Sequence, residues 1–599
     1  MCGIIGYLGN RPAKQILLDG LKKLEYRGYD SAGICILKNK EFLIDKEVGP
    51  VAKLAAAAAK NSGDGVIGIA HTRWATHGRP SVLNAHPHFD CRRDIAIVHN
   101  GIIENYQSLK KILISEGHKF VSETDSEVLA HLIEKFYRGK LEEAVAKTLQ
   151  LVEGSYGLVA LSRREDKLIA ARKSSPLIIG VGRGETFIAS DIPAILKYTK
   201  KIIHLEDDDL AIIDRHGYRI KNRRGRTMDR HIEEVKLNVA QIEKKGFKHF
   251  MLKEIFEQPQ SLANVVSGRL KNGKIKLSLH VQPRDFQKII IVACGTSWHS
   301  ALIGKYLLEE IARVPVAVDY ASEFRYRNPL VGPDDLIIAI SQSGETADTL
   351  AALREAKNKG AKTLSIVNVV GSTLTREVDS GIYLHAGPEI GVASTKAFTS
   401  QVAALLLFAL YLRQQAGNKL DKKLLADLGR LPNLVEQTLK TDAALKSLAR
   451  QFKDKSNFLY LGRGLNFPVA LEGALKLKEI SYIHAEGYPA AEIKHGPIAL
   501  VDDKMPVVFI ATKNDLSDKI ISNMQEIKAR GGKIIAVVDQ DYANIARLAD
   551  YLIKVPVVHK LLAPIINVIP LQLLAYHIAD SKGLDVDKPR NLAKSVTVE

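Results

Sequence analysis

The feature that most constrains the fold is an internal duplication in the second half of the chain. The segment that begins at Ile289 is repeated in pattern from Asn457, and the segment that begins at Asp335 is repeated from Met505. In each pair an apolar strand pattern is followed by a turn and a long helix pattern. The offset of roughly 170 residues is the length of a domain rather than of a solenoid repeat. The sequence therefore predicts two similar domains, each with a parallel α/β sheet.

The chain has 599 residues, which is too many for one hydrophobic core. Short apolar runs alternate with Gly, Asn and Asp in its first third, which predicts strands, and two helices are expected at Ala13–Glu25 and Ser126–Tyr137. This pattern indicates an α+β domain in which sheets meet helices. The expected organisation is this domain over 1–220, a charged linker over 221–245, α/β domains over 246–440 and 441–585, and a C-terminal tail over 586–599.

The net charge of +18 is compatible with nucleic-acid binding. The basic residues are spread along the chain, however, and the one notable cluster, Lys221–Arg230, has no nucleic-acid-binding motif beside it. We therefore expect no nucleic-acid partner. A solvated basic surface that attracts an anionic substrate is the preferred interpretation.

We expect a cytoplasmic protein with no membrane partner. The N-terminus lacks a basic segment followed by an apolar one, so no secretory signal is predicted. The most apolar helical run, Val402–Leu412, is about half the length of a membrane span. The four cysteines lie far apart and form no C-x-x-C pair, which argues against disulfides and a structural zinc site. No cofactor and no metal are expected.

Cys2 becomes the first residue if Met1 is removed, which is sterically easy before a small residue. Its thiol would then lie beside a free α-amine, which titrates at about pH 8 and can act as a base. On position alone, a small buried residue that starts a strand is the alternative.

Further motifs follow Cys2 in a fixed order. They are LEYRGYDSAG (Leu24–Gly33), HTRWATHG (His71–Gly78), NAHPH (Asn84–His88), HNGIIEN (His99–Asn105) and SETDSE (Ser122–Glu127). In this combination the chain resembles, over about its first 220 residues, the class II glutamine amidotransferases, a branch of the N-terminal-nucleophile hydrolases. The resemblance implies an αββα fold and the hydrolysis of L-glutamine, with Cys2 as the nucleophile.

The same resemblance assigns roles within the glutamine site. Asn100 and the backbone N–H of Gly101 would form the oxyanion hole of the tetrahedral intermediate. Arg73 would bind the α-carboxylate of glutamine, and Asp125 would bind its α-ammonium group. The other residues implied are Thr76 and His77, which would line the pocket, and Trp74, which would gate the exit of ammonia.

The histidines of these motifs have an alternative interpretation as metal ligands, because H-P-H resembles a ligand pair. No acidic or thiolate partner stands at ligand spacing from them. We therefore interpret them as hydrogen-bonded scaffold; they are His71, His77, His86, His88 and His99.

Two turns in the first repeat carry hydroxyl groups where a strand ends and a helix begins. They are CGTS (Cys294–Ser297) and SQSGET (Ser341–Thr346). Hydroxyls, a glycine and free N–H groups at a helix N-terminus can hold a phosphate, although Ser and Thr are also ordinary helix caps. The corresponding second-repeat turn reads ATKNDL, and we assign no phosphate to it.

With these turns the two repeats resemble the sugar isomerase (SIS) fold, which binds phosphosugars. The resemblance implies that the first repeat supplies the sugar-phosphate contacts. They are Thr296, Ser297, Ser341, Gln342, Ser343, Thr346 and Val392.

Three further segments complete the predicted sugar site. Glu472, Lys476 and Glu479 are spaced i, i+4 and i+7, which places them on one face of a helix, as supporting groups and a proton-transfer acid or as a solvated salt-bridged stripe. The other two segments are AAEIKHGPIAL, with His495, and the tail DKPRNLAKSVTVE, with Lys594. A tail is ordinarily frayed. This one resembles the tail of the enzymes that aminate fructose 6-phosphate with glutamine, so that the resemblance spans the chain.

The resemblance implies a reaction in two halves. Cys2 would release ammonia from L-glutamine through a thioester. Lys594 would form a Schiff base with the C2 ketone of fructose 6-phosphate after His495 assists ring opening, and Glu479 would move a proton from C1 to C2. It also implies a homodimer in which the residue that matches His495 reaches the partner's site.

Two other functions are compatible with the motifs. One is an amidotransferase that acts on a different phosphosugar, and the other is a phosphosugar sensor, because SIS domains also occur as regulatory modules. A sensor would lack a Schiff-base lysine and a proton-transfer acid, whereas Lys594 and Glu479 stand where the enzymes have them. No long insertion lies between Asp214 and Gln241, so the chain resembles the shorter, bacterial type.

Overall fold

The computed structural model describes all residues except 1, 62, 236–242, 280, 540–542 and 598–599. The chain divides into two compact units. The first unit comprises Met1–Ile242 and Ala593–Glu599, and the second comprises Glu243–Leu592.

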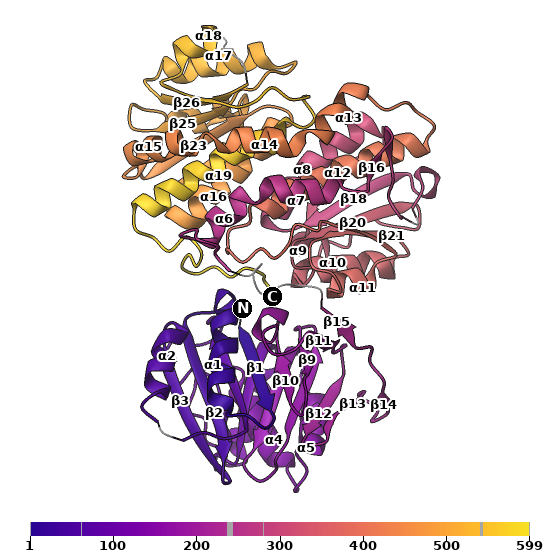
Figure 1. The fold of residues 1–599 in the computed structure, drawn as a ribbon, viewed down its shortest axis with the longest axis vertical. Coiled ribbons are helices and arrows are strands. Elements are labelled where there is room, and N and C mark those ends of the chain that lie inside the picture. The colour runs from indigo at the N-terminus through magenta and orange to yellow at the C-terminus, as the bar shows by residue number, and fades with distance from the viewer. Residues whose placement is uncertain (1, 62, 236–242, 280, 540–542, 598–599) are drawn as a thin grey trace. The chain divides into compact units, whose positions relative to one another are not determined.

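The first unit is built on two antiparallel sheets (Figure 1). Their strand orders are β15-β11-β9-β10-β1-β4-β2-β3 and β14-β13-β12-β8-β7-β6-β5. The strands of the first sheet are β1 (Gly3–Leu8), β2 (Ser31–Lys38), β3 (Glu41–Val48), β4 (Ile67–Arg73), β9 (Ile178–Val181), β10 (Thr186–Ala189), β11 (Lys201–His204) and β15 (Glu233–Glu234). The strands of the second sheet are β5 (His88–Phe89), β6 (Ile95–Ile103), β7 (Gly154–Ser162), β8 (Leu168–Lys173), β12 (Leu210–Asp214), β13 (Gly217–Lys221) and β14 (Thr227–Met228).

Apolar side chains of both sheets form one core between them, with Ile4 and Ile69 from the first sheet and Val98 and Val159 from the second. Helices cover the outer faces: α1 and α2 pack on the first sheet, and α3, α4 and α5 on the second. Their bounds are α1 (Ala13–Leu24), α2 (Val51–Ala58), α3 (Tyr106–Ser115), α4 (Glu127–Phe136) and α5 (Leu141–Leu151). The four-layer αββα fold and both predicted helices are thereby confirmed.

The segment predicted as a linker from residue 221 begins differently. Strand β14 pairs with β13, and β15 pairs with β11, so both strands extend the sheets of the first unit. Between them, Arg230 donates two hydrogen bonds to the buried carboxylate of Asp209, at 3.0 and 2.8 Å. The charge run that predicted a solvated linker is therefore partly used in ion pairs at the sheet edge.

The second unit contains two parallel five-stranded sheets with the same topology. Their orders are β19-β18-β20-β21-β22 and β24-β23-β25-β26-β27. In each sheet the strand that comes second along the chain lies at one edge, beside the strand that comes first. The strands of the first sheet are β18 (Lys288–Ala293), β19 (Val316–Tyr320), β20 (Asp335–Ser341), β21 (Lys362–Val367) and β22 (Ser380–Tyr383). Those of the second are β23 (Asn457–Gly462), β24 (His484–Pro489), β25 (Pro506–Ile510), β26 (Lys533–Val538) and β27 (Tyr551–Lys554). The predicted duplication is confirmed.

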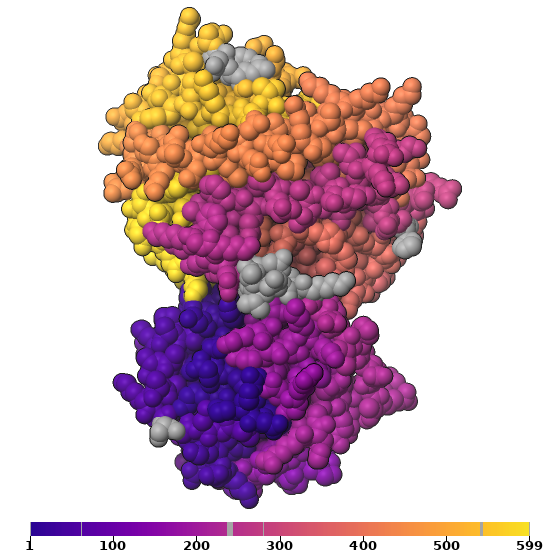
Figure 2. Space-filling model, viewed as in Figure 1, coloured from indigo at the N-terminus to yellow at the C-terminus, as the bar shows by residue number. Residues whose placement is uncertain are grey.

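The helices of the second unit join the two sheets in one apolar core, which includes Ile291 of β18 and Tyr460 of β23. The equivalent helices of the two repeats, α8 and α16, pack against each other, and the early helices α6 and α7 pack beside α19 and α14, from much later in the chain (Figure 2). The helices are α6 (Phe250–Phe256), α7 (Gln258–Val266), α8 (Gly295–Ile311), α9 (Ala321–Phe324), α10 (Ala347–Asn358), α11 (Thr373–Glu377), α12 (Lys396–Gln415), α13 (Lys422–Gly429), α14 (Leu431–Leu439), α15 (Asp442–Phe452), α16 (Asn466–Ser481), α17 (Ser517–Lys528), α18 (Ala543–Leu548) and α19 (Ala563–Ser581).

Helix α12 is the one described helix that is long and apolar enough to cross a membrane. It extends well beyond the apolar run Val402–Leu412 that the sequence suggested. All its residues from Lys396 to Leu412 are buried within the second unit. A helix that is apolar on every side is also typical of the core of a large globular protein.

Candidate active sites

Cys2 precedes β1 and is half-buried, with its thiol against the loop that follows β4. Its Sγ accepts a hydrogen bond from the N–H of Trp74 at 3.3 Å. Its carbonyl oxygen accepts from Asn100 Nδ2 at 3.0 Å and from Arg27 Nε at 3.3 Å. Burial raises the pKa of the Cys2 thiol, although the N–H of Trp74 and the charge of Arg73 oppose this. A thiol with a raised pKa needs a base before it can act as a nucleophile.

His71 on β4 fixes the orientation of Asn100. Its Nε2 lies 3.1 Å from Asn100 Oδ1 and 3.0 Å from the carbonyl oxygen of His99. Because both partners are acceptors, Nε2 carries the proton, and the amide nitrogen of Asn100 is left to face Cys2. Burial lowers the pKa of His71 to about 3, so the imidazole is neutral. This arrangement directs the amide N–H of Asn100 to the backbone carbonyl oxygen of Cys2, in the residue that carries the thiol.

Gly101 follows Asn100 on β6 and has a backbone φ of +131°. A Cβ at this position would lie 2.1 Å from the carbonyl oxygen of Ser155. Only glycine fits this close approach of β6 and β7. Backbone geometry therefore requires glycine at position 101, directly after Asn100.

Arg73 and Asp125 are both buried, and both act electrostatically on the Cys2 thiol. Arg73 Nη2 donates to the carbonyl oxygens of His77 and Gly78, but Nη1 is buried with no hydrogen-bond partner among the described residues. Asp125 Oδ2 accepts from the N–H of Ile103 at 2.8 Å. An unpaired buried guanidinium N–H is costly, and an incoming carboxylate would satisfy it.

The remaining residues predicted for this site lie on the loop after β4. Trp74 and His77 are half-buried, and Thr76 is exposed. Asp30 holds the loop by accepting a hydrogen bond from the N–H of Ala75 at 2.7 Å. Arg27 and Asp30 of the LEYRGYDSAG motif also contact this site, although the sequence predicted no role for either.

The histidines around the site form a neutral, hydrogen-bonded cluster. His99 Nδ1 lies 2.8 Å from Ser126 Oγ, and His88 Nε2 lies 3.0 Å from Thr124 Oγ1. Burial lowers the pKa of His88 and His99, as it does for His71. These contacts agree with the interpretation of the histidines as scaffold.

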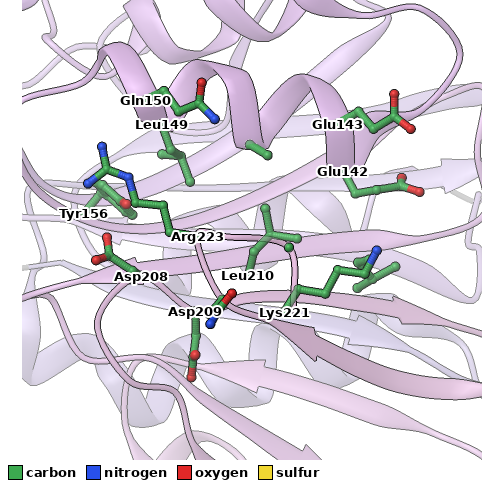
Figure 3. A pocket seen from close by; sticks show the side chains of 14 residues that line it. Glu142, Glu143, Leu149, Gln150, Tyr156, Asp208, Asp209, Leu210, Lys221 and Arg223 are labelled. Atoms are coloured by element: carbon green, nitrogen blue, oxygen red, sulfur yellow. The ribbon is translucent and has the colours of Figure 1, made fainter. Parts of the chain in front are cut away.

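A cavity of about 210 Å³ lies elsewhere in the first unit, between α5 and β12 (Figure 3). Tyr156 and Leu210 line it, together with Lys221 and Arg223 of the basic cluster. None of the residues predicted to bind glutamine lines it. We assign it no part in glutamine hydrolysis.

In the second unit, both hydroxyl-bearing turns lie where the first parallel sheet reverses its strand order. Cys294–Ser297 follows β18, and Ser341–Thr346 follows β20, which is the neighbour of β18. The carboxyl ends of two such strands form the crevice in which open α/β sheets bind ligands. The structure therefore brings the two predicted phosphate turns to one place.

The turn after β20 is shaped by its own hydroxyls. Ser341 Oγ lies 3.1 Å from Thr346 Oγ1 and accepts from the N–H of Gly344 at 3.0 Å. Gly344 has a φ of +68°, and a Cβ there would lie 2.1 Å from Ser372 Oγ. The half-buried members of this turn are Gln342, Ser343, Glu345 and Thr346.

Helix α16 of the second repeat brings charged residues to the turn after β18. The hydroxyl of Thr296 donates to Glu472 Oε1 at 3.1 Å and accepts from Lys476 Nζ at 3.0 Å. Lys476 also pairs with Glu472 at 3.3 Å and with Glu479 at 2.6 Å. Because Glu472 and Lys476 are fully buried, the alternative of a solvated stripe is wrong.

Lys476 is held as a cation. Burial by itself would lower the pKa of Lys476, but the carboxylates of Glu472 and Glu479 outweigh it, and the pKa is raised. A lysine that stays protonated cannot attack a carbonyl to form a Schiff base. Lys476 is therefore a charged support and no candidate for the Schiff base.

Two residues that the sequence did not single out complete the network. His299 Nδ1 lies 2.7 Å from Glu472 Oε2, and Gln401 Nε2 donates to Ser297 Oγ at 2.9 Å. Both belong to long helices, α8 and α12. His299 directly follows the CGTSW turn, one helical turn from Thr296, which is the signal that could have found it.

Val392 is buried, and its N–H donates to the carbonyl oxygen of Asp587 at 3.2 Å. The carboxylate of Asp587 accepts from the N–H groups of Phe250 and Met251, at 2.8 and 2.9 Å, in the first turn of α6. The start of the C-terminal tail is thus anchored on the second unit and is not frayed there.

The last predicted residues are distributed over both units. His495 is exposed at the end of a short 3₁₀ helix, Glu492–His495, in the second unit, which also contains Glu479. Lys594 belongs to the first unit. Its participation in a sugar site therefore stays a prediction.

Comparisons with known proteins cover both units. A family described as a glutamine amidotransferase domain matches residues 71–197, and the SIS domain family matches 284–411 and 451–579. Proteins from Chlorobaculum tepidum and Thermus thermophilus, both named glutamine–fructose-6-phosphate aminotransferase (isomerizing), are each 52% identical, over 617 and 604 residues, which is 100% of this chain and of each relative.

A solved structure resembles the second unit. It is the C-terminal domain of glucosamine-fructose-6-phosphate aminotransferase from Francisella tularensis, with 45% identity and a TM-score of 0.55, and it covers 58% of this chain and 100% of that chain. The resemblances to amidotransferases and to SIS domains are thereby confirmed. The chain belongs to the glutamine–fructose-6-phosphate aminotransferase (isomerizing) family.

Proposed function

We propose that this protein transfers the amide nitrogen of L-glutamine to fructose 6-phosphate and isomerises the product, giving glucosamine 6-phosphate and glutamate. The observation that carries this proposal is that one chain bears an amidotransferase domain and two SIS domains, at full length and 52% identity with relatives named for this reaction. The reaction would supply amino-sugar biosynthesis.

In the glutaminase half, Cys2 attacks the side-chain amide of glutamine. Asn100 Nδ2 and the N–H of Gly101 stabilise the oxyanion, and the free Nη1 of Arg73 supports a role in binding the α-carboxylate. Asp125 binds the α-ammonium group, with Thr76 and His77 as the rest of the pocket. Ammonia leaves, and water hydrolyses the thioester to glutamate.

In the sugar half, the hydroxyls of Thr296, Ser341 and their neighbours bind the phosphate of fructose 6-phosphate. Lys594 forms the Schiff base at C2 after His495 assists ring opening, ammonia replaces the lysine, and Glu479 moves the proton from C1 to C2. The cationic state of Lys476 supports this division of roles, since it leaves the Schiff base to another lysine.

We further propose that ammonia passes past Trp74 to the sugar without mixing with solvent. Incubation with unlabelled glutamine and ¹⁵N-ammonium tests this. Product free of ¹⁵N is expected, and product with the isotope ratio of the bulk ammonium would contradict internal transfer.

We also propose a cytoplasmic homodimer, with His495 acting in the partner's site. The exposure of His495 on the second unit supports this, because an exposed side chain is accessible to a second copy. Sedimentation at micromolar concentration should give the mass of a dimer. Mixing inactive His495→Ala and Lys594→Arg variants should restore part of the activity if the sites are shared.

The direct test is to incubate the purified protein with L-glutamine and fructose 6-phosphate and to measure glucosamine 6-phosphate. Product is expected in a 1:1 ratio with glutamate. Glutamate without amino sugar would reject the proposed acceptor and favour an amidotransferase for another phosphosugar. Binding of phosphosugar without any turnover would favour a sensor.

Two variants separate the halves. Cys2→Ala should lower glutamine-dependent synthesis by at least about 10³-fold and leave the isomerisation of fructose 6-phosphate measurable. Lys594→Arg keeps the charge but cannot form an imine at neutral pH, so synthesis should be lost while glutamine is still hydrolysed. Lys588→Arg, six residues earlier in the tail, is the matched control and should remain active.

A further inference from the structure

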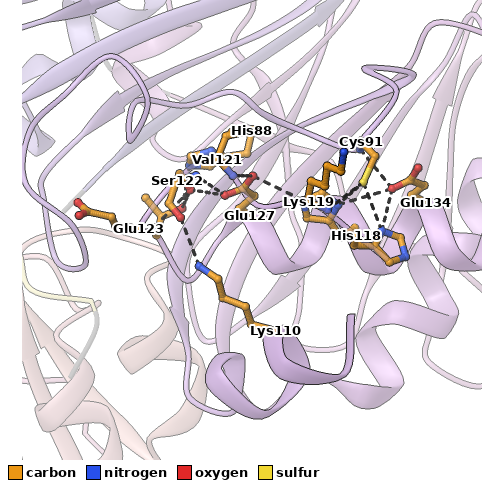
Figure 4. A network of polar contacts seen from close by, with 12 residues as sticks. His88, Cys91, Lys110, His118, Lys119, Val121, Ser122, Glu123, Glu127 and Glu134 are labelled. Atoms are coloured by element: carbon orange, nitrogen blue, oxygen red, sulfur yellow. Dashed lines mark hydrogen bonds and ion pairs between the residues drawn. The ribbon is translucent and has the colours of Figure 1, made fainter. Parts of the chain in front are cut away.

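Four side chains of the first unit converge with donor atoms of the kinds that bind zinc. Figure 4 labels three of them, Cys91, His118 and Glu134. Cys91 follows β5, His118 lies between α3 and α4, and His131 and Glu134 lie on adjacent turns of α4. One ligand atom from each lies within 4.8 Å of the ligand atoms of the other three. We propose that Cys91, His118, His131 and Glu134 bind one Zn²⁺ ion.

The distances between the ligand atoms support a tetrahedral site. Cys91 Sγ lies 3.6 Å from His118 Nδ1 and 3.5 Å from His131 Nδ1. Glu134 Oε2 lies 3.0 Å from His118 Nδ1 and 3.5 Å from His131 Nδ1. Zn–S and Zn–N bonds of about 2.3 and 2.05 Å at the tetrahedral angle separate sulfur and nitrogen by about 3.6 Å. The two sulfur–nitrogen edges already have this length, and the two nitrogen–oxygen edges lie within about 0.4 Å of the roughly 3.3 Å that Zn–N and Zn–O bonds require.

A proton-mediated network explains this geometry less well. Each Nδ1 atom faces both the thiol of Cys91 and the carboxylate of Glu134, but a single N–H can be aimed well at only one of them. Sulfur is a weak hydrogen-bonding partner, so hydrogen bonds to Cys91 would do little to hold two imidazoles beside it. A central cation satisfies all four atoms at once.

The surrounding contacts are those of a supported metal site. Glu127 Oε1 lies 3.5 Å from Nε2 of His131, and both residues are almost completely buried. This contact is an ion-pair distance and not a hydrogen bond, but a carboxylate near the far nitrogen favours a proton there and leaves Nδ1 to ligate. The N–H of Lys119 points at Cys91 Sγ from 3.4 Å, which would stabilise a thiolate.

The proposed site is structural, because four protein ligands leave no position open for substrate. Glu127, the carboxylate near His131, also accepts hydrogen bonds from the N–H groups of Val121 and Ser122, at 2.8 and 2.7 Å. The ion would thus secure the segment that carries Asp125. If the proposed function holds, loss of the ion should raise the KM for glutamine and leave the KM for fructose 6-phosphate unchanged.

The test uses Co²⁺ as a spectroscopic probe in the full-length Cys2→Ala protein, so that the predicted nucleophile cannot bind the metal. After treatment with a chelator, one equivalent of Co²⁺ should give a thiolate-to-cobalt charge-transfer band and the intense visible bands of tetrahedral cobalt. Zinc should displace it in a 1:1 ratio. A spectrum of octahedral cobalt would overturn the proposal, whatever the enzyme's activity.

Variants locate the binding. Cys91→Ser, at an exposed position, should abolish the charge-transfer band and weaken Zn²⁺ binding at least about 100-fold, whereas Cys294→Ser should keep both. Glu127→Gln should weaken binding about 10- to 100-fold. A band that persists in Cys91→Ser would overturn the assignment.

Folding provides a second measurement. Added Zn²⁺ should raise the unfolding temperature of the metal-free protein but not that of Cys91→Ser, since the ion binds only the native site. An equal shift in both proteins would contradict the site. This result does not depend on any activity with glutamine or fructose 6-phosphate.

Discussion

The two repeats of the second unit have the same strand order, but the side chains at their corresponding turns make different contacts. In the first repeat the hydroxyls of Ser341 and Thr346 lie 3.1 Å apart, and Ser341 Oγ accepts a hydrogen bond from the N–H of Gly344. In the second repeat Thr512 is buried, and its Oγ1 accepts from the amides of Asn466 and Asn567, at 3.2 and 2.8 Å. The second repeat fills its own crevice with neutral side chains.

The second repeat nevertheless contributes to the first. Its helix α16 carries Glu472 and Lys476 to Thr296, at the N-terminus of the equivalent helix α8. Under the proposed function, duplication has produced one ligand crevice and one supporting partner from the same topology. The two copies then share a fold but differ in function, because their side chains at the strand ends differ.

The largest expected effect tests the contribution of α16. Lys476→Met removes the cation that pairs with two carboxylates and should lower the free energy of unfolding by about 3–5 kcal/mol. Denaturant unfolding measures it. Lys478→Met, exposed on the same helix, is the control and should change stability by less than about 0.5 kcal/mol. Similar effects in both variants would mean that the buried network does not depend on Lys476.

The second prediction compares a glycine in each repeat. Gly344 and Gly464 both have positive φ, +68° and +53°, but a Cβ on Gly344 would lie 2.1 Å from Ser372 Oγ, whereas one on Gly464 would make only an ordinary 3.5 Å contact with Leu516. Gly464→Ala should therefore cost about 1 kcal/mol. Gly344→Ala should cost about 2–3 kcal/mol more and weaken binding of fructose 6-phosphate. Equal costs in thermal unfolding would contradict the difference between the turns.

The third prediction separates binding from stability. Ser341→Ala should raise the KM for fructose 6-phosphate about tenfold, the loss of one hydrogen bond to a charged group. Thr512→Val should leave this KM unchanged and lower the free energy of unfolding by about 1–2 kcal/mol, because two buried amides each lose one hydrogen bond. Steady-state kinetics and denaturant unfolding measure the two quantities. If Thr512→Val raised the KM as much, the second repeat would also hold phosphate.

The smallest effect extends the comparison to the first unit, where burial lowers the pKa of His71. The pKa of His71 is about 3 in the folded protein and about 6.5 when unfolded. The unfolded chain binds the proton first, so stability from this group is present above pH 6.5 and is lost as the pH falls toward 3. Between pH 7 and 5.5 His71 should cost about 1.3 kcal/mol. Calorimetry at the two pH values measures it, and His71→Gln should lose this part of the dependence.

The sequence predicted much of the fold because its signals are local. Strand and helix periodicity identified the repeats and the helices α1 and α4, and turn composition identified Ser341–Thr346. An ambiguous signal was less informative. The charged segment around Arg230 suggested a linker, whereas Arg230 itself pairs with Asp209 next to β12.

By itself, the sequence determined the order of the domains, the thiol at Cys2 and the hydroxyl-bearing turns, since residue type and spacing along the chain decide them. Tertiary structure alone decided which polar residues are buried together. The spacing of Glu472 and Lys476 is the same for a solvated stripe and for a buried network, and only packing against α8 distinguishes the two. Cys91 and His131 are 40 residues apart with no pattern to join them, yet the packing of α4 beside β5 brings sulfur and nitrogen to 3.5 Å. Contacts between distant segments depend on how elements pack, which local periodicity does not encode.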